Sequence, residues 1–305
     1  MLKMREFPSC FGENGVQVAD TSCSSISGVN KTPQNLVTCV YQCRILHKIC
    51  SVTISWSKNL MGQCLSVGID DSSHHCLCKV DVKPSLFSKR KGSKSLEVSS
   101  CRIDLYWDLS GAKFGSGPEP SEGYYIALVC NGDMALVIGD MRKEAFKKTN
   151  ANATFPNALL VSKKEHVFGK RVFGTKVKFW DGGPVHDLMI ECDTNGVDDR
   201  SLYVRVDSKT VMQVRHLFWK FRGNYTILVD GLPVEVFWDV HKWLFGGTNF
   251  GNAAVFMFQT CSSAEKLWKG KSLSDDSVLA WPSYSESSKS PGLGFSLVLY
   301  AWKNE

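Results

Sequence analysis

The chain has 305 residues, of which 43% are apolar and 22% are charged, and its formal net charge is +6. This apolar content is enough for a sizeable buried core, and the modest charge together with 11% aromatic residues excludes a chain that is disordered throughout. Neither the composition nor any pattern found below identifies a cofactor, and we expect none.

The amino-terminal segment differs in composition from the rest. Residues 1–35 are rich in Ser, Gly, Asn and Asp without a sustained hydrophobic period, so we expect a flexible tail there. Residues 1–10 contain no apolar run of signal-peptide length, which argues against secretion. The twelve cysteines are then expected to be reduced thiols of a cytoplasmic or nuclear protein.

From residue 36 to 303 the chain reads as strand after strand, and we expect one large all-β domain. Residues 51–56 alternate strictly, with Val52, Ile54 and Trp56 on one face and small polar residues on the other. This pattern indicates an antiparallel strand that buries one face.

Tight turns connect these strands. Asn131 and Gly132 separate the apolar runs 126–130 and 134–138. Asn-Gly between two such runs is a strong hairpin signal, because both positions tolerate a positive φ. Similar turns are expected at 181–184, 207–209 and 230–233.

The sequence contains little helix. Residues 141–149 are expected to form about two helical turns, ended by Asn150. Residues 211–219 are expected to form a strand, and the apolar run 217–219 suits a central position because it places apolar groups on both faces.

The long uncharged stretch 243–264 contains too many Gly, Asn and Ser residues for a membrane span, so we expect a loop and then a buried strand at 253–258. Residues 295–302 are expected to form a last strand that returns to the same sheet system. Roughly fifteen short strands at this spacing predict a large antiparallel β-sandwich or flattened barrel with one short helix.

Several segments are similar to a plant family called domain of unknown function 868. The longest is Val229-Asp-Gly-Leu-Pro-Val-Glu-Val-Phe-Trp-Asp-Val-His241, and a second is Trp219-Lys-Phe-Arg-Gly-Asn224. Further similar segments are 35–43, 56–62, 91–98, 107–109, 116–120 and 164–169. The resemblance covers nearly the whole chain and implies a plant source, but it implies no activity and no functional residues.

A cluster of metal-binding residue types lies at 74–78. It contains His74, His75, Cys76 and Cys78. A closed zinc site usually takes two ligand pairs separated by a longer span, and no clear second pair is present. We therefore expect a turn followed by packed cysteines, and no metal site.

Asp239 and His241 are the residues that most resemble a catalytic pair. They would share one face of a strand, where an aspartate can orient a histidine as general base. No Gly-x-Ser-x-Gly elbow supplies a nucleophile, and the glycine-rich stretch 246–251 lacks the lysine of a phosphate-binding loop. We expect the pair to end a strand and cap the next turn, and we expect no enzyme.

Positive charge is unevenly distributed. Residues 141–178 contain ten Lys or Arg and two Glu, a local charge of +8, whereas the rest of the chain sums to −2. A second basic cluster covers 83–94. Such segments could bind nucleic acid, anionic lipid or an acidic protein, or could be solvated hairpin tips and edge strands on which lysine prevents aggregation. The candidate partner-binding residues are Lys89, Arg90, Lys91, Lys94, Lys163, Lys164, Lys170 and Arg171.

Aromatic residues are dense between residues 218 and 258. They are Phe218, Trp219, Phe221, Tyr225, Phe237, Trp238, Trp243, Phe245, Phe250, Phe256 and Phe258. Exposed aromatic rings bind bases or sugars, whereas buried ones fill a β core, and the core interpretation is favoured here.

Three functions remain open from the sequence. The leading hypothesis is a non-enzymatic binding or scaffold protein that directs basic loops toward an acidic partner. The second is a carrier that holds a small ligand in an aromatic-lined cavity. The third is a hydrolase centred on Asp239 and His241.

Overall fold

The structure, a computed structural model, is almost entirely β and confirms the all-β fold class. It describes residues 35–45, 48–60, 62–73, 75–82, 90–98, 101–152, 158–180, 182–193, 200–246, 253–260 and 294–303. The predicted tail, apart from Asn35, lies outside these residues, as do His74 and Lys89. The tail and the single domain therefore stay predictions.

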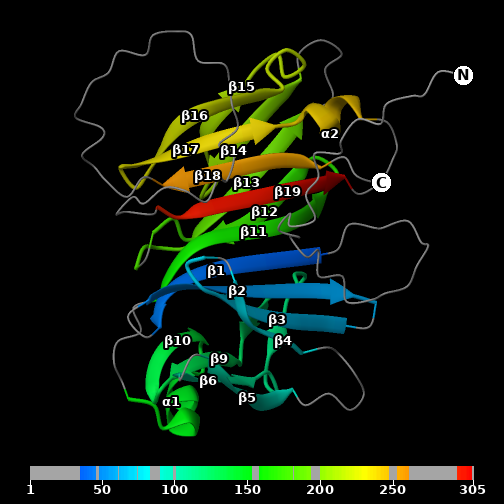
Figure 1. The fold of residues 1–305 in the computed structure, drawn as a ribbon. Coiled ribbons are helices and arrows are strands. Elements are labelled where there is room, and N and C mark those ends of the chain that lie inside the picture. The colour runs from blue at the N-terminus through cyan, green and yellow to red at the C-terminus, as the bar shows by residue number, and fades with distance from the viewer. Residues whose placement is uncertain are drawn as a thin grey trace, which may run out of the picture. The chain divides into compact units, whose positions relative to one another are not determined.

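One nine-stranded sheet runs through the described chain (Figure 1). Its strands in spatial order are β16 (Arg222–Val229), β17 (Leu232–Asp239), β18 (Ala254–Thr260), β19 (Ser296–Lys303), β11 (Leu159–Gly169), β1 (Asn35–Ile45), β2 (Lys48–Asn59), β3 (Gly62–Asp70) and β4 (Cys76–Val82). All neighbours pair antiparallel except β11 and β19, which run parallel.

Two four-stranded sheets pack against this long sheet. The first has the order β10 (Asp133–Gly139), β9 (Tyr125–Cys130), β6 (Cys101–Asp108) and β5 (Lys91–Val98). The second has the order β12 (Val172–Val177), β13 (His186–Asp193), β14 (Ser201–Val206) and β15 (Lys209–Val214). The remaining elements are β7 (Lys113–Phe114), β8 (Pro120–Glu122), α1 (Arg142–Thr149) and α2 (His241–Phe245).

The two smaller sheets cover the same face of the long sheet and form two sandwiches. Cys39, Lys163 and Leu297 are register partners on β1, β11 and β19, so their side chains share one face. Cys39 belongs to the first core, between β1–β4 and the β5–β10 sheet. Leu297 belongs to the second core, between β16–β19 and the β12–β15 sheet. Because none of these described sheets closes on itself, the architecture is a sandwich rather than a barrel.

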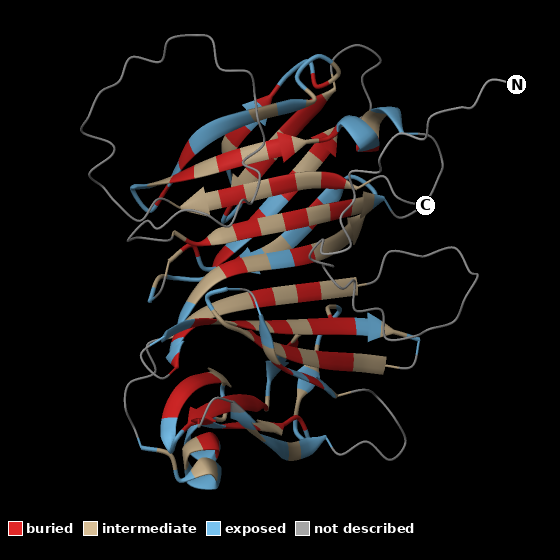
Figure 2. Cartoon of the chain, viewed as in Figure 1, coloured by how far each residue is buried: buried red, intermediate tan, exposed pale blue. Residues whose placement is uncertain are grey.

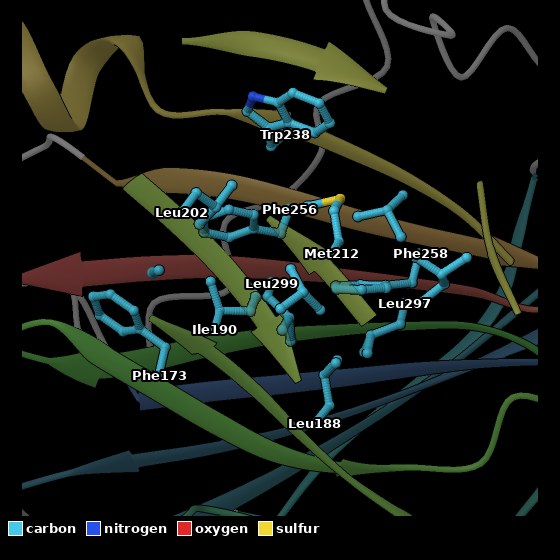
Figure 3. Close-up of a cluster of buried hydrophobic side chains, with 14 of the residues drawn as sticks. Phe173, Leu188, Ile190, Leu202, Met212, Trp238, Phe256, Phe258, Leu297 and Leu299 are labelled. Atoms are coloured by element: carbon cyan, nitrogen blue, oxygen red, sulfur yellow. The ribbon is translucent and has the colours of Figure 1, made fainter. Parts of the chain in front are cut away.

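Alternating burial explains why these segments form strands. Buried and partly exposed residues alternate along β17, β18 and β19, as Figure 2 shows by its red and tan bands. Figure 3 shows the inward side chains of the second core, where Phe256 and Phe258 meet Ile190 and Leu202 from the facing sheet. Strand β9 is buried along its whole length because α1 covers its other face through Ala145.

The turns predicted at 131–132, 207–209 and 230–233 are present, whereas Asp181, in the turn predicted at 181–184, lies outside the described residues. Asn131 and Gly132 have φ values of 48° and 89°, and the equivalent turn residues Asp230 and Gly231 have 49° and 80°. The left-handed conformation of Asn150 ends α1 as expected.

The predicted strand 211–219 is wrong in its second half. Strand β15 ends at Val214, and residues 217–219 form a turn. Met212 and Val214 point inward on alternate positions, whereas the next buried residue is Leu217, so the period-two pattern breaks between them. The structure also has a second short helix, α2, that the sequence did not indicate.

A buried ionic cluster lies where the two cores adjoin. The Lys163 ammonium is 3.1 Å from Glu119 and 2.6 Å from Glu165, and the Thr175 hydroxyl donates to Glu165 over 2.5 Å. Leu160 lies three residues before Lys163 on β11 and packs against both cores. Burial alone would lower the pKa of Lys163, but the two carboxylates outweigh it and raise that pKa above its usual range.

Two glycines on edge strands leave room for tryptophan rings. Gly92 on β5 pairs with Trp107, and Gly223 on β16 pairs with Trp238. A Cβ atom at either glycine would lie 2.6 Å or 2.3 Å from the facing indole. The rings therefore lie across the glycines, an arrangement that compensates a strand for the missing side chain.

Replacing Lys163 by methionine is expected to destabilise the fold. Glu165 is only 5% exposed and would lose its cation, which typically costs about 3–5 kcal/mol. Urea unfolding should report this loss. Lys164→Met, at the next and exposed position of β11, is the control and should change the free energy of unfolding by no more than about 0.5 kcal/mol. Equal unfolding midpoints for the two variants would contradict the cluster's role.

Gly92→Ala and Gly223→Ala are each expected to cost about 1–3 kcal/mol, because the new methyl group must displace a packed indole. Gly115→Ala is the matched control, since nothing lies within 4 Å of the added Cβ. Chemical denaturation of the three variants checks the prediction, and a Gly223→Ala protein as stable as Gly115→Ala would refute it.

Candidate functional site

The predicted basic cluster around residue 90 lies on an edge strand of the first sandwich. Lys91 forms an ion pair with Asp108 at 2.7 Å, and the Lys94 ammonium donates to the carbonyl of Lys79 over 3.3 Å. Arg90 is exposed beside them. Strand β5 pairs with β6 on one side only, and lysines on such an edge strand hinder its association with the edge of another sheet.

The second predicted cluster is divided by the structure. Lys163 is mostly buried and its ammonium group forms ion pairs with Glu119 and Glu165, so it is not accessible to a partner. Lys164 is exposed on the outer face of β11. Lys170 and Arg171 are exposed in the hairpin between β11 and β12. The seven predicted residues that the structure describes therefore do not form one surface.

Lys170 and Arg171 instead lie at one end of the second sandwich together with cations that the sequence did not single out. The backbone N–H of Cys192, near the end of β13, donates to the Arg171 carbonyl. Arg200 lies at the same end, because it directly precedes Ser201, the register partner of Asp193. Lys303 is the register partner of Gly169. We call this end the rim, and its cations are Lys170, Arg171, Arg200, Arg215, Lys220, Lys242 and Lys303.

An exposed large apolar side chain of the rim comes from the connection between β15 and β16. Leu217 is fully buried and its N–H donates to the Arg200 carbonyl, which anchors the turn. The N–H groups of Trp219 and Lys220 both donate to the His216 carbonyl, which closes it. Trp219 follows this anchor with 87% of its surface exposed.

Four aromatic rings pack together where the β15–β16 connection meets α2. Phe218 and Phe245 have centroids 5.6 Å apart, and Phe221 lies 5.0 Å from the His241 ring. Phe245 joins both pairs, at 5.9 Å from Phe221 and 5.2 Å from His241, and is itself 49% exposed. These contacts join the β15–β16 connection to α2. Figure 1 shows α2 on the same side of the molecule as the end of β19.

The rim cations have few negative partners. Arg222 is neutralised by Asp239, whose carboxylate it contacts at 2.8 Å. Among the described residues, none of the seven rim cations forms an ion pair. Arg200 lies over the Phe218 ring at 4.3 Å and Lys303 over the Trp243 ring at 4.2 Å. The pKa of Lys303 is lowered mainly by burial and also by the positive charge of Arg200. Arg200 and Lys303 are therefore near enough to repel each other.

Asp239 and His241 form a cap. The His241 N–H donates to Asp239 over 2.9 Å at the start of α2, and the other carboxylate oxygen is held by Arg222. The His241 ring packs on Phe221 and Phe245. Among the described residues, no hydroxyl or thiol is hydrogen-bonded to this ring. The hydrolase alternative therefore gains no support from the geometry.

The predicted cysteine turn has no convergent ligands among the described residues. Cys76 is exposed, Cys78 is buried, and the N–H groups of Ser73 and His75 donate to Asp71. The described part of the chain contains no group of three or more side chains placed to hold a metal ion. It also contains no helix long and apolar enough to cross a bilayer.

A second polar cluster lies at the end of the sandwich opposite the rim. His186 is 3% exposed, and its Nδ1 is 2.7 Å from Asp207 while its Nε2 is 3.3 Å from Asp230. The second contact is an ion-pair distance without hydrogen-bond geometry. Asp207 and Asp230 belong to turns of the two facing sheets, so His186 links the sheets.

The histidine and the Asp187 N–H lower the pKa of Asp207. A carboxylate with a depressed folded-state pKa stabilises the fold above its unfolded pKa of about 3.9 and loses that contribution as the pH falls through the folded value. Asp207→Asn keeps a residue that tolerates the left-handed backbone (φ 49°) and removes the charge.

The stability gap between wild type and Asp207→Asn should therefore be full at neutral pH and shrink below about pH 4. Urea midpoints measured across this range check it. Asp81→Asn, at an exposed position of β4, is the control and should show no comparable gap. A gap that is absent at neutral pH would contradict the link.

Sequence reasoning missed most of the rim because it interpreted its aromatic residues as core. Trp238, Trp243, Phe256 and Phe258 are buried as expected, but Trp219, Tyr225 and Phe245 are exposed, and Phe250 lies outside the described residues. The available signal was the interleaving of cations with rings from Arg215 to Arg222, which suits a surface turn better than a central strand.

Comparison with known proteins agrees with the resemblance found in the sequence. A family model described as "Plant protein of unknown function (DUF868)" matches residues 32–303. Comparisons with curated proteins and with solved structures gave no match. Since the match spans nearly the whole chain, this protein belongs to the plant family of unknown function DUF868.

Proposed function

We propose that this chain is a non-enzymatic binding or scaffold protein of the plant cytosol or nucleus that directs basic loops toward an acidic partner. The observation that carries the proposal is the rim, where seven cations lack a carboxylate partner among the described residues. Unneutralised cations raise the local potential and increase both the rate and the strength of binding to anions.

The other described surfaces support this proposal less well. At β5 the lysines are engaged by Asp108 and by a backbone carbonyl. On α1, Arg142, Lys143, Lys147 and Lys148 also form a basic surface, but none of the four is accompanied by an exposed aromatic ring within the helix. The rim combines positive charge with exposed Trp219 and Phe245, and Trp and Arg are the residue types enriched in binding hot spots.

A charge reversal at the rim tests the proposal. Lys220→Glu combined with Lys242→Glu should elute from a heparin column at clearly lower salt than wild type, because heparin is a polyanion and these exposed lysines face it. Circular dichroism confirms that the variant is folded.

Lys147→Glu combined with Lys148→Glu on α1 is the matched control, since it changes the net charge by the same amount. Retention should stay closer to wild type in this control. Equal losses in the two variants would mean that retention follows total charge rather than the rim, which would contradict the proposal.

A further inference from the structure

We propose that the acidic partner of the rim is the surface of an anionic phospholipid membrane. This inference rests on the proposed function and names the partner class of the same surface. Trp219 would lie at the headgroup boundary, with the rim cations facing the lipid phosphates and carboxylates.

The form of the β15–β16 turn suits such a surface. Its backbone is fixed by the buried Leu217 and by the two N–H groups that donate to the His216 carbonyl. The indole beyond it contacts no other ring among the described residues. One exposed tryptophan is ordinary by itself, but this one follows a hydrogen-bonded turn and lies among cations that form no ion pair within the described part of the chain. Tryptophan is also the residue type that concentrates at membrane interfaces.

The charges of the rim add a long-range attraction. Lys170, Arg171, Arg215, Lys220 and Lys242 are exposed. Arg200 is less exposed, and its buried Nε has no hydrogen-bond acceptor among the described residues. An anionic leaflet attracts clusters of this kind, and the attraction grows with each lysine or arginine that reaches the surface. Lipid phosphates would also supply acceptors for guanidinium groups.

The packing of the aromatic rings favours a membrane over single-stranded nucleic acid. A strand of bases is bound by successive rings that each offer a free face. In the rim, Phe218, Phe221, His241 and Phe245 contact one another at centroid distances of 5.0–5.9 Å. Their faces are therefore partly used within the protein. The exposed indole of Trp219 and the half-exposed ring of Phe245, which packs on Phe218, offer apolar groups to a surface without forming a row of free ring faces.

Vesicle binding of the full chain tests the inference. Wild type should sediment with vesicles of phosphatidylcholine mixed with phosphatidylserine, should remain in solution with pure phosphatidylcholine vesicles, and should be released as salt rises. Brominated lipids should quench tryptophan fluorescence in wild type, and Trp219→Phe should reduce that quenching, since Trp219 is 87% exposed whereas Trp56, Trp238 and Trp243 are buried and Trp107, Trp180 and Trp302 are partly buried.

Two rim variants and two matched controls give the expected magnitudes. Each lysine is expected to contribute about a fivefold factor to vesicle binding, so Lys220→Ala with Lys242→Ala should weaken it roughly 25-fold. Trp219→Ala should weaken it by about tenfold or more, because an indole leaves the interface. The controls are Lys147→Ala with Lys148→Ala on α1, and Leu228→Ala, which removes a 67% exposed side chain from β16. Both controls should bind like wild type.

A single-stranded oligoribonucleotide separates the failures. Binding of the oligoribonucleotide through the rim without phosphatidylserine-dependent vesicle binding overturns the membrane inference and leaves the proposed function intact. Absence of binding to vesicles, oligoribonucleotide and heparin overturns both. Vesicle binding that the rim variants and the controls reduce equally also overturns the membrane inference.

Discussion

The pairing of β11 with β1 on one side and β19 on the other is the constraint on which the rest of the fold depends. This strand belongs to both cores, so the hydrogen-bond ladder passes from one sandwich to the other without interruption. Its inward face must therefore serve two cores, and Leu160 packs against both. The polar groups that follow, Lys163 and Glu165, are retained there because they satisfy each other together with Glu119 and Thr175.

The same strand directions decide what gathers at the rim. Since β11 and β19 run parallel, both end at the side where β12 starts, and β15 ends at that side too. Connections that are far apart in sequence thus bring their cations to one end, whereas the turns at the opposite end place Asp207 and Asp230 around His186. The charged side chains that the described turns carry are therefore placed by the way the strands pair.

Local patterns in the sequence were sufficient for local structure. The alternation of Val52, Ile54 and Trp56 and the turn at Asn131–Gly132 depend on neighbours in the chain, and both are present. The parallel pairing of β19 and the division into two cores depend on contacts between distant segments, which no short pattern encodes. Trp219 was misjudged for a related reason. An apolar run predicts burial, but the alternation of buried residues in β15 stops at Val214, so the run 217–219 does not continue the strand.

Several of the described polar groups have their partners within the fold, whereas others face solvent. Asp239 is held by Arg222 and the His241 N–H, His186 by Asp207 through Nδ1, and Lys163 by two glutamates. Each arrangement that resembles a catalytic pair is therefore occupied in linking elements of the fold. What the described surface leaves unsatisfied is positive charge beside an exposed indole, and such groups act by attracting and burying a partner.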